Sequence, residues 1–285
     1  MRRPILIAGA AGQLGTALQT LGPTRGFHIV APDEGSLDIT SPSDVEGVVG
    51  AFARAYPDGA VVNAAAYTNV DKAEEDSARA FLVNQYGAAL LGEAASRNGL
   101  SYVHISTDFV FDGKKTGSYS ELDVPSPLSV YGASKLAGER AVTAADPSAL
   151  VVRTAWTYGP GASNFVSKIL EKARQTDTLQ VVSDEVGSPT YTMDLADALL
   201  RLIDVGATGL MHLTNSGWCS RDEFAREILR LAGLDQVEVV SVRSSAFPSK
   251  AARPANSVLD CSRAGILGIV MSNWRDALTR YIESL

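Results

Sequence analysis

The chain has 285 residues, of which 46% are hydrophobic and 20% are charged, a composition typical of a globular protein of one large domain or two modest ones. Its formal net charge of −7 gives no overall positive field that would attract nucleic acid, and no polybasic run is present to bind an anionic membrane. The sequence therefore predicts no nucleic-acid partner and no membrane partner.

Cysteine and histidine usage gives no sign of a metal or redox centre. Cys219 and Cys261 form no CxxC pair, and the three histidines are scattered. Chains rich in disulfides belong to oxidising compartments, and this chain, with two cysteines, does not resemble them. We therefore expect a cytoplasmic protein that requires no metal.

Short apolar runs alternate with longer amphipathic runs through the first half of the chain. Buried strands are predicted over residues 4–9, 28–33, 60–66, 101–111 and 149–159. Helices are predicted to follow the first four of them, over residues 12–22, 42–57, 77–99 and 130–145. Continuous apolar strands, each followed by a helix, are typical of a parallel sheet buried on both faces. The sequence therefore predicts an α/β fold with a doubly wound, Rossmann-like parallel sheet.

The alternation becomes less regular after about residue 156. Helices are still predicted over 164–175, over 220–233 with Ser220 as the cap, and near the end of the chain. We expect residues 1–155 and about 190–215 to form a dinucleotide-binding domain. The remaining residues, about 156–189 and 216–285, are expected to form a smaller mixed α/β lobe that binds the substrate.

A glycine-rich turn follows the first predicted strand. Gly9, Gly12 and Gly15 have G-x-x-G-x-x-G spacing, and they interrupt an apolar run that could otherwise pass for an export signal. Glycines let the backbone approach a pyrophosphate closely, and the N-terminus of the following helix offers unpaired N–H groups. We therefore predict that this turn, including Gln13 and Leu14, binds a dinucleotide.

Asp33 ends the second predicted strand, where a carboxylate can accept hydrogen bonds from an adenosine ribose. The same carboxylate would repel the 2′-phosphate of NADPH, and no arginine adjoins it in the sequence, so the local chemistry favours NADH. Asp38 and Ile39 are expected near the adenine. The alternative for either aspartate is a solvated loop position.

The stretch VYGASKLAGE places Tyr131 four residues before Lys135 on a predicted helix, so the two side chains share one face. This spacing also occurs on many solvated helices. Together with the glycine turn and with Thr107 after the fourth predicted strand, however, the pair resembles the extended short-chain dehydrogenase/reductase family.

A finer resemblance runs almost from end to end. The motifs GQLG, VVNAAAYTNVDKAE, STDFVFDG, SPLSVYGASKLAGE, VVRTAWTYG, NF, VGSPT and RPANSVLD are similar, in that order, to those of the dTDP-4-dehydrorhamnose reductases. The resemblance implies that NADH or NADPH reduces the C4 ketone of dTDP-4-dehydro-L-rhamnose to give dTDP-L-rhamnose.

The resemblance also implies roles for individual residues. Tyr131 would donate a proton to the ketone, Lys135 would lower the pKa of the phenol and bind the nicotinamide ribose, and Thr107 would hydrogen-bond the ketone oxygen. Asn84 would order the site, with helix packing as the alternative. The cofactor would be lined by Ala66, Tyr67 and Thr68. The substrate would be contacted by Thr107, Asp108, Tyr131 and Trp156 at the sugar, and by Asn164, Phe165, Arg253 and Asn256 at the diphosphate or base.

Two positions depart from the family pattern. Phe109 stands where tyrosine is frequent, and Glu185 stands where VxDQxGxPT would have glutamine, which adds a charge near the expected substrate lobe. Another dTDP-4-keto-deoxysugar, such as one used in antibiotic biosynthesis, is therefore an alternative substrate. Some members hold metal at a dimer interface, but no acidic cluster here matches it, and the chain is expected to be a monomer or a homodimer.

Other functions share the fold. The 4,6-dehydratases resembled here carry Asp-Glu after the threonine, whereas this chain has Asp108-Phe109 and lacks one of the two groups that elimination needs. A non-catalytic NADP-binding regulatory subunit would not need Thr107, Tyr131 and Lys135 together. The sequence therefore favours a reductase over an epimerase, a dehydratase or a binding subunit.

Overall fold

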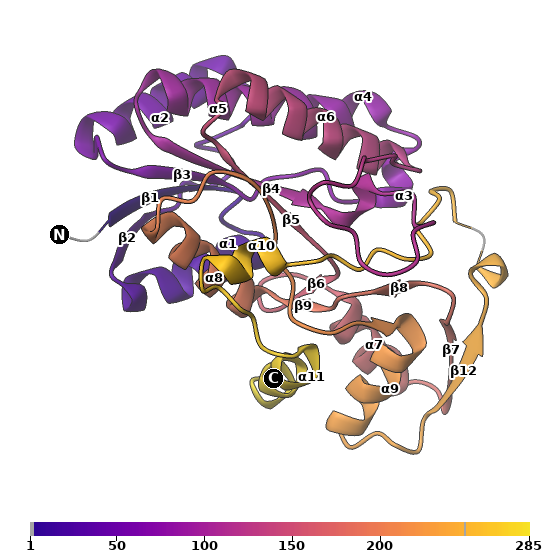
Figure 1. The fold of residues 1–285 in the computed structure, drawn as a ribbon. Helices are drawn as coiled ribbons and strands as arrows, with labels where there is room; N and C mark the ends of the chain where they lie inside the picture. Colours follow the sequence, from indigo (N-terminus) through magenta and orange to yellow (C-terminus); the bar gives the residue numbers. More distant parts are fainter. Residues whose placement is uncertain (1–2, 248) are drawn as a thin grey trace.

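The structure is a computed structural model that describes residues 3–247 and 249–285, and Figure 1 shows their arrangement. Six parallel strands form the central sheet in the order β10-β5-β4-β3-β1-β2. Their bounds are Arg3–Ala8 (β1), Phe27–Val30 (β2), Ala60–Asn63 (β3), Ser101–Thr107 (β4), Leu150–Thr154 (β5) and Gly209–His212 (β10). The predicted doubly wound parallel sheet is confirmed.

Helices cover both faces of this sheet. One face is covered by α2 (Pro42–Ala55), α5 (Ala88–Arg97) and α6 (Val130–Ala145), and the other by α1 (Gln13–Leu21) and α8 (Thr192–Asp204) (Figure 1). Because both faces are buried, the side chains in the middle of β1 are apolar on both sides, which explains why the strands read as unbroken apolar runs.

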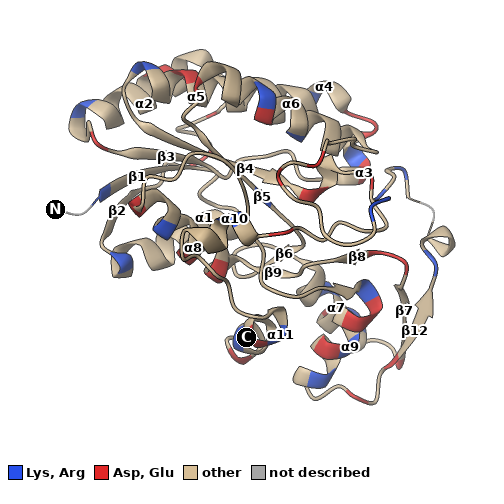
Figure 2. Ribbon diagram, viewed as in Figure 1, with Lys and Arg blue, Asp and Glu red and all other residues tan. Residues whose placement is uncertain are grey.

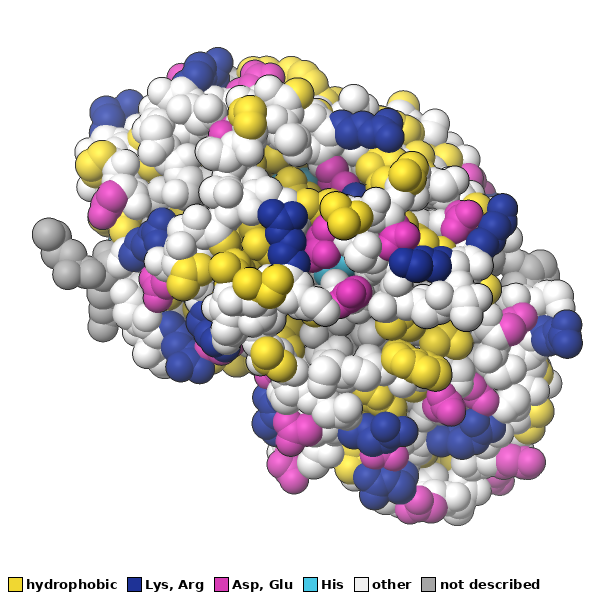
Figure 3. Space-filling view, viewed as in Figure 1, with side chains coloured by type: hydrophobic (Ala, Val, Ile, Leu, Met, Phe, Trp, Pro, Cys, Tyr) yellow, Lys and Arg dark blue, Asp and Glu magenta, His cyan; other side chains and the backbone are white. Residues whose placement is uncertain are grey.

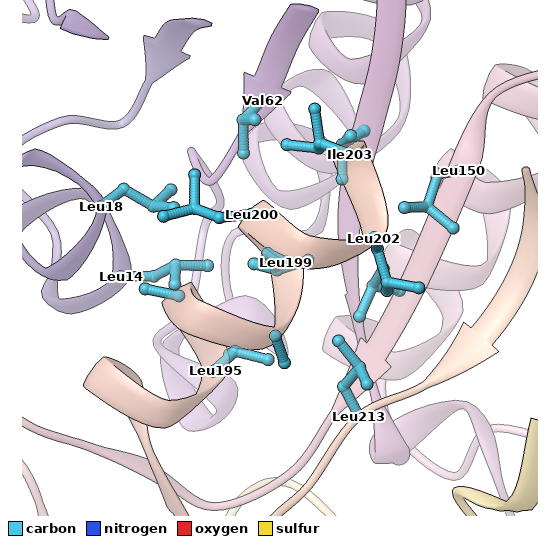
Figure 4. Close-up of a cluster of buried hydrophobic side chains, with 14 of the residues drawn as sticks. Leu14, Leu18, Val62, Leu150, Leu195, Leu199, Leu200, Leu202, Ile203 and Leu213 are labelled. Atoms are coloured by element: carbon cyan, nitrogen blue, oxygen red, sulfur yellow. The ribbon is translucent and has the colours of Figure 1, made fainter. Parts of the chain in front are cut away.

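The core between α1, α8 and the sheet holds α8 in place against the sheet. In Figure 4, Leu14 and Leu18 of α1 meet Leu199 and Leu200 of α8, with Val62 of β3 nearby. Burying a leucine side chain fully contributes roughly 1.5–3 kcal/mol, so this cluster fixes α8 on the sheet although it lies far along the chain. The expected division into two domains stays a prediction.

Two predicted elements are interrupted in the structure. The helix expected over 77–99 consists of α4 (Ser77–Phe81), a π-helical segment over Leu82–Gly87, and α5. The strand expected over 149–159 ends at Thr154, because Trp156 has a left-handed backbone with φ of 44°. Both interruptions occur beside the site described below, where such local departures are common.

The second part of the chain packs around its own buried aromatic cluster, which includes Tyr158, Phe224 and Trp274. Its elements are β6 (Thr157–Tyr158), α7 (Phe165–Ala173), β7 (Thr178–Val182), β8 (Val186–Gly187), β9 (Thr190–Tyr191), β11 (Cys219–Ser220), α9 (Arg221–Leu231), β12 (Glu238–Val242) and α11 (Trp274–Glu283). The predicted Ser220 cap is confirmed, because its hydroxyl accepts the Glu223 N–H and the Glu223 side chain returns to the Ser220 N–H.

The elements that were not predicted include the short helices α3 (Val70–Ala73) and α10 (Ser262–Ile266), the short strands β8, β9 and β11, and β12, which pairs with β7. None of the described helices is long and apolar enough to span a membrane. Acidic and basic residues occur side by side on α9 in Figure 2, and the two kinds of charge are interspersed on the face shown in Figure 3.

Candidate active site

A cavity of about 760 Å³ opens at the carboxyl edge of the sheet, and we call it the central cavity. Its walls come from the segments that follow β1, β3, β4 and β5, together with the first turns of α6. In open parallel sheets this edge is where ligands bind. The volume lies within the range usual for sites that hold a small molecule or a cofactor.

The glycine turn forms one end of the central cavity. Gly9 has φ of +82°, and a Cβ at this position would lie 2.5 Å from the Ala65 nitrogen, so the turn requires glycine there. Gly12, Gln13 and Leu14 also line the cavity. Gly15 does not line it. Its role is packing, because a Cβ there would lie 2.4 Å from the Gly9 oxygen.

Several buried polar atoms around the central cavity find no hydrogen-bond partner among the described residues. They are Gln13 Oε1, Tyr67 Oη, Asp108 Oδ2, Thr154 Oγ1 and Thr192 Oγ1. Buried polar atoms are rarely left unpaired, so these atoms are candidates for hydrogen bonds with a polar ligand or with water. The glycine turn and these open hydrogen-bonding positions fit a nicotinamide dinucleotide.

Asp33, Asp38 and Ile39 line the same cavity, as do Ala66, Tyr67 and Thr68. The Asp33 carboxylate accepts the Ser36 N–H at 2.8 Å, and hydrogen bonds from Ser36 lower the pKa of Asp33, so it is ionised at neutral pH. The fold also brings Arg79 of α4 to this cavity, although no arginine adjoins Asp33 in the sequence. Arg79 is a cation that a 2′-phosphate could contact, so the local preference for NADH is weaker than the sequence indicates.

The three expected catalytic residues meet in the central cavity. Tyr131 lies in the first turn of α6, Lys135 one turn later, and Thr107 at the end of β4. The Lys135 Nζ donates to the Ile105 oxygen at 2.6 Å, which fixes the ammonium beneath the cavity. The Phe109 ring packs edge-on against Tyr131, with 5.6 Å between the ring centres.

The pKa of the phenol differs from the expectation. Burial raises the pKa of Tyr131 to about 12, and burial lowers the pKa of Lys135 to about 8. The expected lowering of the phenol pKa by Lys135 is therefore not found: burial raises the pKa of Tyr131 most, the Asp108 carboxylate raises it further, and only a hydrogen bond with Thr107 lowers it. A phenol with this pKa is protonated at neutral pH, which is the form that a proton donor needs.

Asn84 connects three parts of the site. Its Oδ1 accepts the Tyr67 N–H at 2.8 Å, and its Nδ2 donates to the Tyr67 oxygen and to the Ser134 hydroxyl at 3.1 and 2.9 Å. These bonds join the π-helical segment, the loop after β3 and helix α6. The arrangement supports the ordering role that we expected for Asn84.

Trp156 is held on the opposite wall. The Trp156 ring packs so closely on Gly187 that a Cβ there would lie 2.4 Å from the ring. The ring also contacts the Arg221 guanidinium, which lies 3.4 Å from the ring centre. A left-handed backbone at a non-glycine residue is uncommon and often marks a functional position. Asp108 lies close by, where its Oδ1 accepts the Thr107 hydroxyl at 3.0 Å.

A second cavity of about 1310 Å³ lies among α7, β7 and the segments 244–247 and 249–255, and we call it the lobe cavity. Asn164 and Phe165 line it, and Arg253 lines both cavities. Asn164 also caps α7 by accepting the Ser167 N–H at 3.1 Å. Asn256 lies apart, in a third cavity, where its amide donates to the backbone oxygens of Lys115 and Gly117.

The RmlD substrate binding domain model matches residues 1–285. The chain belongs to this family. It is 40% identical to the spore coat polysaccharide biosynthesis protein SpsK of Bacillus subtilis, covering 98% of this chain and 96% of the relative. It is also 40% identical to the dTDP-4-dehydrorhamnose reductase of Aggregatibacter actinomycetemcomitans, covering 96% of each.

Another relative in Streptomyces antibioticus, named "Probable dTDP-4,6-dihydroxy-2-methyloxan-3-one 4-ketoreductase", is 40% identical, with 96% of this chain and 92% of that protein covered. Among solved structures, the dTDP-4-dehydrorhamnose reductase of Bacillus anthracis in complex with NADP superimposes with a TM-score of 0.95, 35% identity and full coverage of both chains. The resemblance drawn from the sequence motifs is confirmed.

In this member of the RmlD family, the segment after Thr68 has a structural role that the sequence analysis did not assign. The Asp71 carboxylate binds the Arg253 guanidinium, with 2.7 Å between Oδ2 and Nη2, and accepts the Ala251 N–H. The Glu74 carboxylate accepts the Val130 N–H at 2.8 Å, at the start of the helix that carries Tyr131. The motif NVDKAE thus joins the segment around Arg253 to α6.

Within residues 3–247 and 249–285, no three His, Cys, Asp or Glu side chains are grouped so that they could hold a metal ion. The expectation that no metal is required stays a prediction, as does the monomeric or dimeric state.

Asp108→Asn is expected to stabilise the protein above about pH 6. Burial raises the pKa of Asp108 to about 6, so the native state binds this proton more tightly than the unfolded state, and stability falls as the pH rises from about 4 to about 6. The asparagine keeps an acceptor for Thr107 and removes the buried charge. We expect a gain of roughly 1–3 kcal/mol at pH 8 and none near pH 4, measured by urea unfolding.

The exposed Asp58→Asn is the control and should leave the difference between the two pH values unchanged. Equal stability of Asp108→Asn and wild type at pH 8 would contradict the inferred burial of a charged carboxylate.

Proposed function

We propose that this chain uses NADH or NADPH to reduce the C4 ketone of dTDP-4-dehydro-L-rhamnose to dTDP-L-rhamnose. The observation that carries the proposal is that Thr107, Tyr131 and Lys135 line one cavity with the glycine turn. Relatives of almost the same length bear the name of this activity, and one of them holds NADP. These similarities support the same reaction here.

The cofactor would lie along the central cavity. Gly9, Gly12, Gln13 and Leu14 would hold its pyrophosphate, because their backbone is open at the N-terminus of α1. The adenosine end would face Asp33, Asp38, Ile39 and Arg79, and the nicotinamide end would face Ala66, Tyr67, Thr68 and Lys135. We propose both NADH and NADPH, because the Asp33 carboxylate could accept hydrogen bonds from the adenosine ribose of NADH and Arg79 could contact the 2′-phosphate of NADPH.

The bound cofactor supplies the hydride that adds to C4. Tyr131 donates its phenolic proton to the ketone oxygen, and Thr107 donates a hydrogen bond to the same oxygen as negative charge develops there. Lys135 would hydrogen-bond the nicotinamide ribose. Its positive charge also stabilises the phenolate that remains on Tyr131 after the proton has left.

The substrate would span both cavities. The sugar would contact Asp108 and Trp156, and the nucleotide would extend toward Asn164, Phe165 and Arg253. Asn256 is proposed only as an outlying contact, because it lies in the third cavity. We further propose a cytoplasmic location, since the two cysteines are free thiols, and we keep the monomer or homodimer as a proposal.

A second candidate is the reduction of another dTDP-4-keto-deoxysugar. The Streptomyces antibioticus relative, which has the same identity to this chain as the rhamnose enzymes, is named for such a ketone. Glu185, which departs from the rhamnose pattern, forms an ion pair with Arg221 beside Trp156 and so changes the wall near the sugar.

The test is to incubate the protein with freshly prepared dTDP-4-dehydro-L-rhamnose and to follow the absorbance of NADPH and of NADH. We expect oxidation of both cofactors that depends on the sugar. No oxidation would overturn the proposal, and a kcat/KM that is much higher for a different dTDP-4-keto-sugar would favour the second candidate.

Trp156→Ala is expected to raise the KM for the dTDP-sugar by about 10-fold, because it removes the apolar wall that contacts the C6 methyl edge of the sugar. The dissociation constant of NADPH should stay nearly unchanged. Steady-state kinetics and a cofactor titration check the two values. A lower Tm with an unaltered KM would instead show that the ring acts only in packing.

A further inference from the structure

Arg221 lies where the two cavities meet, because its side chain lines both the central cavity and the lobe cavity. Arg253 also lines both. If the sugar of a nucleotide-sugar lies at Tyr131 and its nucleotide lies in the lobe cavity, the diphosphate must pass these two arginines. At this junction, therefore, the positive charges of the two arginines can complement the negative charge of the diphosphate.

The lobe cavity is basic, although the chain carries a net charge of −7. Its charged lining residues are Lys168, Lys172, Arg221, Lys250 and Arg253, against Asp184 and Glu185. Because the positive charge is confined to the cavity, it attracts an anionic ligand to that place, although the net charge of the protein is negative.

The two arginines at the junction differ in what they already bind. The Arg253 guanidinium is held by Asp71, with Nη2 at 2.7 Å and Nη1 at 3.4 Å from the carboxylate oxygens, and Nη1 also donates to the Ala251 oxygen. Both terminal nitrogens thus already donate within the protein, although Nη2 keeps a second N–H and no bond of Nε is found among the described residues. Arg253 therefore serves first to hold the segment around Ala251 against α3.

The Arg221 guanidinium keeps its donors available. Its Nε interacts with the Glu185 carboxylate at 3.6 Å, and among the described residues no ion pair of its two terminal nitrogens is found. Its side chain is only 19% exposed, and it lies over the Trp156 ring at 3.4 Å from the ring centre. A guanidinium held in this way presents a fixed pair of donors, which is the geometry that binds phosphate oxygens.

We propose that Arg221 binds the diphosphate of the nucleotide-sugar substrate, while Trp156 and Glu185 hold the guanidinium in position. The inference rests on the proposed function, because it takes the substrate to be a nucleoside diphosphate sugar. The inference gives Trp156 two roles. Its ring contacts the sugar, and it also supports the guanidinium that binds the diphosphate.

The test measures the dissociation constants of dTDP and of thymidine by calorimetry for the wild type and for Arg221→Met. The methionine keeps the apolar stem and removes the charge. We expect dTDP to bind about 10- to 100-fold more weakly and thymidine to bind within about 2-fold of wild type, because only the charged hydrogen bonds to phosphate are lost. Arg230→Met, on the same helix with its side chain 58% exposed, should change neither constant.

Arg221→Lys is the second variant, because it keeps the charge without the fork and should weaken dTDP binding by about 3- to 10-fold. An unchanged dTDP constant in Arg221→Met, or equal losses for dTDP and thymidine, would overturn the proposal. If wild type binds UDP as tightly as dTDP and Arg221→Met weakens both, the phosphate role stands and the thymidine-linked substrate is overturned. If the enzyme reduces dTDP-4-dehydro-L-rhamnose while Arg221→Met binds dTDP normally, the function stands and this inference fails.

Discussion

Replacing Tyr131 with phenylalanine is expected to lower kcat by about 100-fold or more. The substitution keeps the ring, its burial and its edge-on contact with Phe109, and it removes the proton donor. A positioned general acid contributes about 10²–10⁴ to the rate, and the remaining turnover would rely on Thr107 and on water. Steady-state oxidation of NADPH in the presence of the sugar measures the loss.

Cofactor binding is the internal control for this variant. Lys135 and the glycine turn are unchanged, so the dissociation constant of NADPH should stay within about 3-fold of wild type. The partly exposed Tyr86→Phe, which lies outside the central cavity, should have wild-type turnover. Wild-type turnover in Tyr131→Phe would show that the proton reaches the ketone from another group.

Replacing Glu139 with glutamine is expected to lower the free energy of unfolding by about 3–5 kcal/mol. The Glu139 carboxylate accepts Nε and Nη2 of Arg153 at 2.8 and 2.7 Å, and it also accepts the Ser106 hydroxyl. The side chains of Glu139 and Arg153 are only 8% and 3% exposed. Glutamine has nearly the same shape but leaves the Arg153 charge buried without its counterion. Urea unfolding measures the change.

The double variant Glu139→Met with Arg153→Met is the matched control. Replacing a whole buried ion pair with apolar residues is often neutral, so the double variant should recover most of the lost stability. A loss below about 0.5 kcal/mol in Glu139→Gln would contradict this account. The pair also joins α6, which carries Tyr131, to β4 and β5, so the single variant should lose turnover at temperatures where it is still folded.

The sequence predicted the central sheet because each strand lies buried between two layers of helices. Such strands appear in the sequence as short apolar runs, a pattern that can be recognised from neighbouring residues alone. The break at Trp156 could not be predicted, because no local signal specifies a left-handed tryptophan. The conformation is held by contacts with Gly187 and Arg221, which lie much later in the chain. The π-helical segment around Asn84 was missed for the same reason.

The candidate site was predictable where its residues follow strand ends. Thr107 ends β4, and the glycine turn ends β1, so the topology alone brings them to one edge. Arg79 and Arg221 were not assigned roles, because they come from other elements and carry no motif of their own. Asp71 lies in the motif NVDKAE, but its partner Arg253 comes much later in the chain, so the contact could not be predicted. The pKa of Tyr131 was expected to move down and is raised, because burial cannot be read from the spacing of a tyrosine and a lysine.

The most direct test of the central claim uses NADPH in which both hydrogens at C4 of the nicotinamide are replaced by deuterium, with dTDP-4-dehydro-L-rhamnose as the substrate. We expect the wild-type protein to form dTDP-L-rhamnose with one deuterium at C4 of the sugar for each NADP produced, as measured by NMR and mass spectrometry. Deuterium at any other carbon of the sugar, or oxidation of NADPH without a labelled sugar, would contradict the assignment of this chain as a C4 ketone reductase.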